Sequence, residues 1–324
     1  AERVLDFEGA LIATGSIPRK LDFAGANYTS SSDALLELRT PPRSLVIVGS
    51  GVVAMEFAQV FARLGSKVHI LMHGQKVLQN MEQDIVHHLI EHSAQLGIQF
   101  HQSAEIEKIE RSGDAYRVFL KNAETLDGDF VLNASGRVPN IDTLDLASAN
   151  ILRDKHGIKV NEYLRSVNNP KIFAAGDAHG FLELSPVASY EGKIVAENFL
   201  QADTVQTDYS AIPKAVFTVP PFASVGMTED EAKHKSLAVT VLKEDMRDYK
   251  VFTIAGAAPS YAKILVDSNS KILGAHVYAS GADNTIHIFA MAMRYGLTTR
   301  DLAQMVYVYP SFTSAFGTLV SKLT

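Results

Sequence analysis

A glycine turn between two apolar strands limits the possible folds of this chain more than any other feature. Residues 43–72, RSLVIVGSGVVAMEFAQVFARLGSKVHILM, read as an apolar strand, a turn with Gly49 and Gly51, a helix and a second apolar strand. Apolar residues recur at helical spacing between the two strands, as packing on a sheet requires. The sequence therefore predicts a βαβ unit with parallel strands, and hence an α/β domain over residues of about 40 to 125.

The same glycine turn predicts a dinucleotide site. Gly49 and Gly51 stand where the strand must turn sharply into the helix and where the backbone must approach a pyrophosphate without an intervening Cβ. The N-terminus of the helix offers unpaired N–H groups and a partial positive charge to the phosphates. Ala54 stands in the third glycine position, which this fingerprint permits. The flanking strand and helix favour an NAD(P) site in a Rossmann-like domain over a plain tight turn.

The end of the second strand, LMHGQK, bears on the choice between NAD and NADP. A carboxylate there would bind the ribose hydroxyls, whereas a basic residue would bind a 2′-phosphate. Residues 72–75 contain no acid, and His73 and Lys76 could meet a phosphate, so the sequence favours NADP; a solvated loop is an equally good interpretation. Glu56, early in the helix, either faces the nicotinamide or is an ordinary acid of the first turn, stabilised by the helix dipole.

Two similar segments flank the predicted α/β domain. ALIATGSIP ends at Pro18 and FVLNASGRVP ends at Pro139, and each is a short apolar strand followed by Ala, Thr or Ser, Gly, two residues and Pro. An inserted domain must leave its host and re-enter it nearby. The repeat therefore indicates an insertion, although so short a pattern also arises by chance.

A second strand-turn-helix pattern follows the second of these segments. NPKIFAAGDAHGFLELSPVASYEGK predicts a buried strand, a turn with Gly176 and Asp177, and a helix with Ser185 as its N-cap and Pro186 at its first position. Asp177, at a strand exit, either accepts hydrogen bonds from ligand hydroxyls or closes an ordinary Asp turn.

The last third of the chain is predicted to be an α+β domain. From about residue 212, short strands alternate with turns, including a hairpin turn at residues 268–270. Helices are expected at 283–295, closed by Gly296, and from 299 to the end. Strands grouped before helices indicate an antiparallel sheet.

Composition excludes several classes of protein. The net charge of −6 comes from scattered carboxylates and there is no basic stripe, so we expect no nucleic-acid partner. We expect no membrane span and a cytoplasmic protein, because no apolar run approaches transmembrane length and the first ten residues do not resemble a signal peptide.

Cysteine is absent, so these residues form no disulfide and supply no thiolate. His88 and His92 have the spacing of a helical metal pair, but no third ligand is implied, and we expect both on the solvated helix face and no metal site.

Taken together, these segments resemble the flavin-dependent pyridine nucleotide-disulfide oxidoreductases, the family of glutathione reductase, dihydrolipoamide dehydrogenase and mercuric reductase. The resemblance covers essentially the whole chain and is carried, in family order, by IATGSIP, VIVGSGVVAMEFA, ASGRVPN, IFAAGDAHG, SPVASYEGK, IPKAVFTVPPFASVGMTEDEA and YPSFTSAF. It implies an α/β fold in which a Rossmann-like NAD(P)-binding domain, residues 39–126, is inserted in a partial FAD-binding domain, residues 1–38 and 127–205. It also implies an α+β dimerisation domain, residues 206–324, that forms a homodimer.

The resemblance assigns roles to the matching residues. Gly176 and Asp177 would bind the ribityl side of FAD, and Ser185 would place a helix N-terminus at the pyrimidine end of the isoalloxazine, where the dipole favours reduced flavin. The crossings between the domains would hold Thr14, Gly15 and Arg137 on the FAD side. The residues assigned to NAD(P) are Gly49, Gly51, Ala54, Glu56, His73 and Gly136.

The chain departs from the family pattern in two places. It lacks the first glycine fingerprint for FAD and the redox-active cysteine pair, so we expect a fragment of a longer enzyme that holds FAD weakly and is inactive alone. Tyr309 precedes Pro310 where disulfide reductases of the family have a His-Pro pair, and Ser314 replaces the glutamate that orients the histidine. A tyrosine hydroxyl donates a proton but is a poor base near neutral pH. Tyr309 and Glu56 are the catalytic candidates.

The predicted function is hydride transfer from NAD(P)H through FAD to a disulfide or another small-molecule acceptor. The alternative is a non-catalytic, nucleotide-binding dimer that serves as a sensor or scaffold, motivated by the missing cysteines and histidine. A third interpretation, a Rossmann dehydrogenase without flavin, leaves the ATGS and AAGD segments unexplained.

Overall fold

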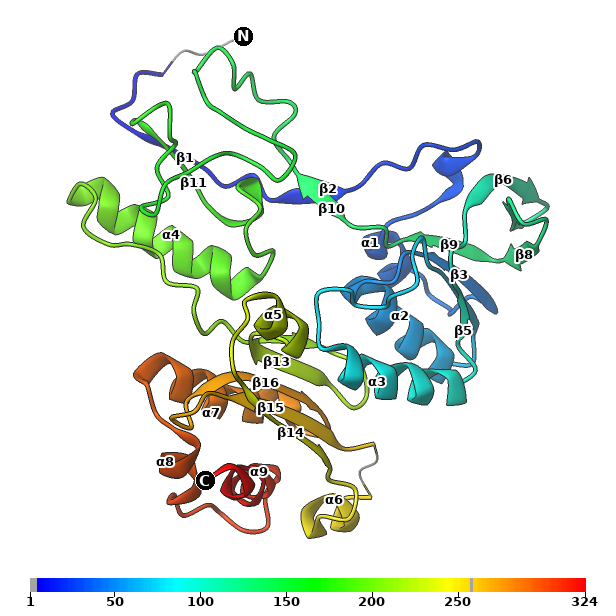
Figure 1. Cartoon of the computed structure of the whole chain (residues 1–324). Coiled ribbons are helices and arrows are strands. Elements are labelled where there is room, and N and C mark those ends of the chain that lie inside the picture. Colours follow the sequence, from blue (N-terminus) through cyan, green and yellow to red (C-terminus); the bar gives the residue numbers. More distant parts are fainter. Residues whose placement is uncertain (1–4, 257–258) are drawn as a thin grey trace. The chain divides into compact units, whose positions relative to one another are not determined.

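The computed structural model describes residues 5–256 and 259–324, which form two compact units (Figure 1). Unit 1 contains the chain up to Lys20 together with Gly136–Tyr209, and unit 2 contains Leu21–Ser135 together with Ser210–Thr324. The structure thus groups residues 21–38, which the sequence assigned to the FAD domain, with unit 2. The functional domain boundaries stay a prediction.

The first half of unit 2 is an α/β module built on a parallel sheet. The sheet has the strand order β5-β4-β3-β9, and all neighbours are parallel. β3 leads through the glycine turn into α2 and then into β4, which confirms the predicted βαβ unit. The bounds are η1 Ala26–Tyr28, α1 Ser32–Leu36, β3 Ser44–Val48, α2 Val52–Arg63, β4 Lys67–Leu71, α3 Gln83–Gln95, β5 Gln99–His101 and β9 Phe130–Asn133.

Both faces of this parallel sheet are covered, which explains why its strands are almost continuously apolar. On β3, Leu45 and Ile47 pack against α2, whereas Val46 and Val48 pack against a small antiparallel sheet. That sheet has the order β6-β7-β8, with the predicted polar turn at residues 112–114 joining its first two strands. Its bounds are β6 Ile106–Ser112, β7 Ala115–Leu120 and β8 Thr125–Gly128.

The second half of unit 2 is the predicted α+β module. Its antiparallel sheet has the order β12-β13-β16-β15-β14, and the expected hairpin turn joins β15 to β16. The predicted helix from 299 to the end is wrong as one element: α8 ends at Ala303, and a new helix, α9, begins after Pro310 with Ser311 as its N-cap. The bounds are β12 Lys214–Val216, β13 Phe222–Gly226, α5 Glu229–His234, β14 Thr240–Asp245, α6 Lys250–Ile254, β15 Tyr261–Val266, β16 Ile272–Tyr278, α7 Ala282–Tyr295, α8 Thr299–Ala303, α9 Phe312–Val320 and η3 Ser321–Leu323.

Alternate residues of β15 and β16 face different partners, as the two-residue period of a strand dictates. Ala262 and Ile264 belong to the core that includes α7 and α9. Tyr261 stacks on His88 of α3 with 3.6 Å between the ring centroids, and the Tyr278 hydroxyl lies 2.7 Å from Nδ1 of His92. The expectation that both histidines lie on a solvated face is therefore wrong, because the second module covers that side of α3.

In unit 1, the described residues form two short sheets and one long helix. β1, Ala10–Ile12, pairs in parallel with β11, Ile172–Ala174, and β2, Ser16–Pro18, pairs antiparallel with β10, Arg137–Pro139. The ends of the two repeated segments thus pair with each other, whereas the strand of the second segment, β9, belongs to the sheet of unit 2. The one-turn 3₁₀ helix η2, Gly176–Ala178, follows β11.

Helix α4 of unit 1 runs over Ser185–Leu200. Its N-cap is Leu184, whose carbonyl accepts the first helical hydrogen bond from Ala188 at 3.0 Å. The prediction of Ser185 as N-cap is therefore wrong by one residue, and Ser185 and Pro186 both lie within the first turn. Within residues 5–256 and 259–324, none of the helices is both long enough and apolar enough to cross a membrane.

Candidate functional site

The turn between β3 and α2 contains two glycines that differ in their surroundings. Gly49 has a φ of +121°, and a Cβ there would lie 2.1 Å from the carbonyl oxygen of Ala134. Gly51 has a φ of −85°, and a Cβ there would meet no heavy atom within 4 Å in the described chain, apart from its neighbours. The fold requires glycine at 49, whereas at 51 the missing Cβ keeps space open in front of the helix.

The N-terminus of α2 adjoins that open space. Val52, its first residue, is 42% exposed. As in any α-helix, the N–H groups of the first turn have no intrahelical partner and can be bonded by a ligand. Ala54 is fully buried against the sheet, where a larger side chain would push the helix away. A helix N-terminus behind a small residue can bind phosphate by hydrogen bonds and by its dipole.

Glu56, one turn into α2, binds backbone of the second module. Its Oε1 accepts a hydrogen bond from the N–H of Phe217 at 2.7 Å. Two further α2 side chains hold the same segment: Gln59 accepts from the N–H of Val219 at 2.9 Å, and Arg63 donates to the carbonyl of Val219 at 2.8 Å. Burial raises the pKa of Glu56, and the hydrogen bond from Phe217 opposes that rise. A contact between Glu56 and a nicotinamide stays a prediction.

The loop after β4 carries exposed basic side chains. His73 and Lys76 are both exposed, as the sequence suggested. Sequence reasoning missed Glu105, which follows the neighbouring strand β5. Lys121 donates to Glu105 at 2.7 Å and lowers the pKa of that carboxyl, with a smaller contribution from the nearby charge of His73. The loop therefore offers two basic groups with a carboxylate close to one of them.

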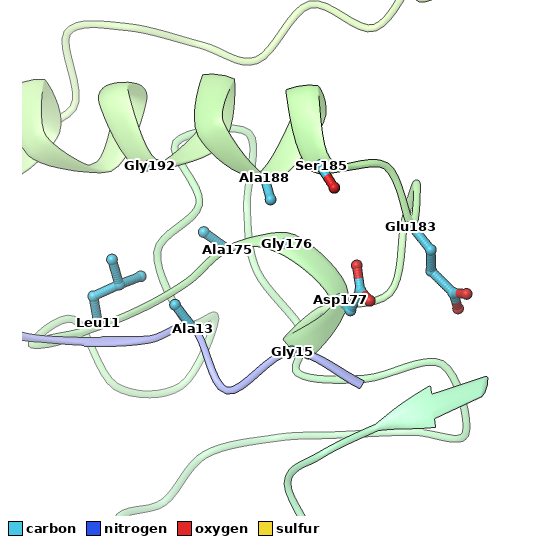
Figure 2. A pocket seen from close by; sticks show the side chains of 10 residues that line it. All are labelled: Leu11, Ala13, Gly15, Ala175, Gly176, Asp177, Glu183, Ser185, Ala188 and Gly192. Atoms are coloured by element: carbon cyan, nitrogen blue, oxygen red, sulfur yellow. The ribbon is translucent and has the colours of Figure 1, made fainter. Parts of the chain in front are cut away.

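Unit 1 contains a pocket of about 320 Å³ between η2 and α4 (Figure 2). Of the predicted FAD residues, Gly15, Gly176, Asp177 and Ser185 line it. Asp177 and Ser185 point toward one another from the η2 turn and the start of α4. Gly176 has a φ of +63°, and a Cβ there would come within 3.0 Å of Ala188, so the turn lies close against the helix. The volume is at the lower end of the range for ligand pockets.

Asp177 is linked to Arg137 through a residue that the sequence analysis did not single out. Ser16 donates to Oδ2 of Asp177 at 2.5 Å and accepts from Nε of Arg137 at 2.7 Å. The pairing of β2 with β10 brings Ser16 and Arg137 together. Partial burial and the neighbouring charge of Asp177 raise the pKa of Glu183, which also lines the pocket. The only sequence signal for Ser16 was its place in the ATGS segment.

Thr14 and Gly136 lie near the same strand pair but do not line the pocket. The carbonyl of Thr14 accepts from the side chain of Asn140 at 3.3 Å, and the carbonyl of Gly136 accepts from the N–H of Arg19 at 3.0 Å. Gly136 belongs to unit 1, whereas the glycine turn belongs to unit 2. The assignment of Gly136 to NAD(P) stays a prediction.

Tyr309 is 63% exposed on the segment between α8 and α9. Tyr307 instead turns inward: its hydroxyl donates to the carbonyl of Leu302 at 2.8 Å, and burial raises its pKa. Ser314 completes the capping box of α9, in which its N–H donates to Oγ of Ser311 at 3.1 Å. Ser314 thus has a local structural role at the start of α9.

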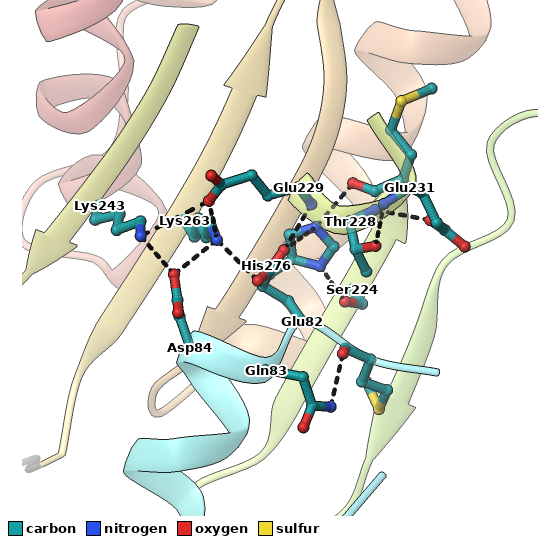
Figure 3. Close-up of polar contacts among 12 residues, drawn as sticks. Glu82, Gln83, Asp84, Ser224, Thr228, Glu229, Glu231, Lys243, Lys263 and His276 are labelled. Atoms are coloured by element: carbon teal, nitrogen blue, oxygen red, sulfur yellow. Dashed lines mark hydrogen bonds and ion pairs between the residues drawn. The ribbon is translucent and has the colours of Figure 1, made fainter. Parts of the chain in front are cut away.

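A buried ion cluster in unit 2 was also missed by sequence reasoning (Figure 3). Nζ of Lys263, on β15, lies 2.8 Å from Glu82, 2.7 Å from Asp84 and 2.6 Å from Glu229. Lys243 adds a contact of 2.6 Å to Asp84. The cluster joins the start of α3 to the antiparallel sheet. Across the described ranges, no group of three or more histidines and carboxylates is arranged to hold a metal ion.

Comparison with known proteins identifies the family. The model of the pyridine nucleotide-disulphide oxidoreductases matches residues 1–192, and that of the dimerisation domain of the same family matches residues 212–320. The chain therefore belongs to the pyridine nucleotide-disulphide oxidoreductases, which confirms the resemblance. Its mixed α/β fold is that of the flavoprotein disulfide reductases, an FAD/NAD-binding region followed by a dimerisation domain.

Individual relatives share about a third of the sequence. Mercuric reductase of Lysinibacillus sphaericus is 31% identical over 97% of this chain and 58% of its own length. Glutathione reductase of Burkholderia cepacia is 32% identical over 96% of this chain and 70% of its own length. The HOCl-induced flavoprotein disulfide reductase RclA of Escherichia coli has a TM-score of 0.90 at 27% identity, over 97% of this chain and 73% of that one. The chain thus spans a little over half of the mercuric reductase.

Proposed function

We propose that this chain supplies the NAD(P)-binding, dimerisation and part of the flavin-binding regions of an NAD(P)H oxidoreductase that passes hydride through FAD to a disulfide or another small acceptor. The observation that carries the proposal is the environment of Gly51. Its φ of −85° suits any residue and its Cβ position is open, so nothing in the described fold demands glycine there. A ligand that approaches the backbone at the helix N-terminus provides the missing reason.

The dinucleotide proposed for this site is NADPH. Its pyrophosphate would lie against Gly51 and the N-terminus of α2, and its 2′-phosphate would meet Lys76 and His73. Both side chains are exposed on the loop after β4. NADH is the competing ligand, because Glu105 lies close to His73 and a carboxylate favours ribose hydroxyls.

The pocket of unit 1 would bind the ribityl chain of FAD. Gly15 and Gly192 both line it, and each has open space where a Cβ would stand. Asp177 would accept from a ribityl hydroxyl, while Ser185 and the start of α4 would lie near the flavin ring. These donors and acceptors fit a polyhydroxyl chain. When bound, FAD supplies the two-electron chemistry that joins NAD(P)H oxidation to reduction of the acceptor.

The proposals for the final acceptor and the assembly rest on composition and on the family relationship. The 324 residues contain no cysteine, so no dithiol within them relays electrons. A homodimer would form through the C-terminal module, with Tyr309 exposed beside it as a proton donor. The family relationship and the composition together support a cytoplasmic location. The competing proposal, a dimeric sensor that binds nucleotide without turnover, is favoured by the tyrosine in place of the family histidine.

Ligand titrations of the full chain test this proposal. NADPH and NADH are titrated by calorimetry against the wild type, Gly51→Ala and Lys76→Ala, and FAD binding is followed by flavin fluorescence. We expect Gly51→Ala to weaken both dinucleotides by about a hundredfold and Lys76→Ala to weaken only NADPH, by about tenfold. NADPH oxidation with an artificial quinone acceptor then separates an enzyme from a sensor. Equal dinucleotide affinities of the wild type and Gly51→Ala would contradict the proposal that a bound dinucleotide explains the glycine at position 51.

A further inference from the structure

Glu191, on α4 of unit 1, is the least expected side chain near the proposed flavin pocket. It is fully buried, and carboxylates are seldom buried without compensation, because desolvation of the charge costs several kcal/mol. The residue does not line the pocket. Its contacts therefore decide why the chain keeps a carboxylate at this position.

Three donors converge on the Glu191 carboxylate. The N–H of Gly176 donates to Oε2 at 2.6 Å, and the hydroxyl of Tyr209 donates to Oε1 at 2.7 Å. Nε2 of His179 lies 3.0 Å from the same Oε1. Burial alone would raise the pKa of Glu191, but the hydrogen bonds from His179, Tyr209 and Gly176 outweigh it and lower the pKa. The carboxylate is thus held as an anion inside unit 1.

The first of these donors is the backbone of the turn that carries Asp177. The N–H of Gly176 lies in the peptide between Ala175 and Gly176, so its hydrogen bond to Glu191 fixes the backbone one peptide before the residue that carries the Asp177 side chain. Ser16 restrains the other end of the residue, at Oδ2 of Asp177. Asp177 is therefore held from two sides, by Glu191 through the backbone and by Ser16 through the side chain.

The other two donors brace Glu191 itself. His179 lies just after η2 and Tyr209 lies at the end of unit 1, beyond α4. Tyr209 also packs edge-on against Tyr190, which adjoins Glu191 on the helix. The carboxylate consequently ties the turn, the helix and the end of unit 1 together at one point.

We propose that Glu191 is a positioning residue, which holds the Gly176–Asp177 turn so that the carboxylate of Asp177 faces the pocket and is available to a ligand hydroxyl. This inference rests on the proposed binding of FAD in unit 1. Glu191 does not touch the ligand and acts only through Asp177. A glutamine at position 191 has one acceptor oxygen in place of two, so it cannot accept from Gly176 on one side and from Tyr209 and His179 on the other, and the hold on the turn weakens.

A double-mutant cycle on FAD affinity tests the coupling. The full-length variants are Glu191→Gln, Asp177→Ala and the pair, with Glu197→Gln, an exposed glutamate of the same helix, as control. We expect Glu191→Gln and Asp177→Ala each to weaken FAD binding by about tenfold, and the pair to be no weaker than Asp177→Ala alone. Full additivity of the two losses would overturn the proposal, because Glu191 would then act independently of Asp177.

Amide hydrogen exchange distinguishes failure of this inference from failure of the proposed function. We expect exchange at Gly176 to accelerate by about tenfold or more in Glu191→Gln, and by less in Tyr209→Phe, which removes one brace and keeps the ring packing. We expect exchange at Gly176 to be unchanged in Glu197→Gln. If the wild type binds no FAD, the flavin proposal fails for this chain, and the exchange at Gly176 still decides the positioning role. Unchanged exchange in Glu191→Gln would overturn it.

Discussion

Lys263 of β15 and Glu82, immediately before α3, form a buried ion pair with 2.8 Å between Nζ and Oε1. Their side chains are 1% and 6% exposed, and 181 positions of sequence separate them. The second oxygen of Glu82 accepts the N–H of Glu229 at 2.9 Å, which anchors the start of α5 to the same point. Desolvation of two charges is costly, and the ion pair together with the hydrogen bond from Glu229 offsets that cost. The two modules of unit 2 are thus joined by a buried polar contact.

Replacement of Lys263 by methionine should strongly destabilise unit 2. The variant keeps most of the side-chain volume but leaves the buried carboxylate of Glu82 without its cation, which typically costs about 3–5 kcal/mol. Urea unfolding of the full chain measures the change. Lys235→Met, at an exposed lysine that ends α5, is the control and should change the stability by less than about 0.5 kcal/mol. A loss below about 1 kcal/mol for Lys263→Met would show that the cluster is not structurally important.

Stability should fall with acid because of the same cluster. Partial burial alone would raise the pKa of Asp84, but hydrogen bonds from Lys243 and Lys263 outweigh it and lower the pKa from 3.8 to about 2. Hydrogen bonds from Lys233 and Lys263 lower the pKa of Glu229 from 4.5 to about 2. Since both folded values lie below the unfolded ones, the stabilisation is complete above the unfolded values and disappears as pH falls toward about 2.

The acid dependence can be assigned by substitution. The urea midpoint of the wild type should decline between about pH 5 and pH 3, and Asp84→Asn combined with Glu229→Gln should flatten that decline. Glu107→Gln, at an exposed glutamate on β6, should retain it. An identical slope in the double variant and the wild type would place the acid sensitivity elsewhere.

The features that sequence analysis predicted correctly have local causes. The strand, glycine turn and helix at 43–72 follow one another without interruption, and the positive φ of Gly49 satisfies a requirement that few residues can meet. The antiparallel C-terminal sheet was predictable because its hairpin turn and short strands are adjacent in the chain. The N-cap of α4 was misplaced by one residue because a Ser-Pro pair is common both as N-cap and first helical residue and as the first two helical residues. The two arrangements differ only in which carbonyl accepts the first helical hydrogen bond.

The features that sequence analysis missed depend on partners distant in the chain. Ser16 and Asp177 are 161 positions apart, and nothing in either segment indicates the other. In the sequence, Glu191 looks like an ordinary polar residue of an amphipathic helix. The three groups that donate hydrogen bonds to its buried carboxylate all lie outside α4, so the helix pattern does not reveal them. His88 was placed in solvent for the same reason: its covering partner, Tyr261, belongs to a strand more than a hundred residues later.

The two glycines of the β3–α2 turn should respond differently to alanine. Gly49→Ala would bring a Cβ to 2.1 Å from the carbonyl oxygen of Ala134, so we expect a loss of about 2–4 kcal/mol in stability and loss of dinucleotide binding. Gly51→Ala should cost no more than about 1 kcal/mol of stability, because Gly51 is the N-cap of α2 and alanine is a poor N-cap, and its main effect should be on binding. Thermal unfolding and NADPH calorimetry on the same samples separate the effects. Marked destabilisation by Gly51→Ala would mean that position 51 is constrained by the fold rather than by a ligand.

The segment between α8 and α9 should contribute to a homodimer. Val306 and Val308 are 98% and 81% exposed, and Tyr309 beside them is 63% exposed, in the part of the chain matched by the dimerisation-domain model. Burial of one valine contributes roughly 1.5–3 kcal/mol, and a two-fold axis applies each substitution twice. We therefore expect Val308→Asp to weaken dimerisation by about a hundredfold or more, measured by light scattering across a dilution series. Leu237→Asp, at a partly exposed leucine just after α5, serves as the control and should leave the dimer intact. If Val308→Asp remains dimeric at low concentration, the interface lies on another face of the C-terminal module.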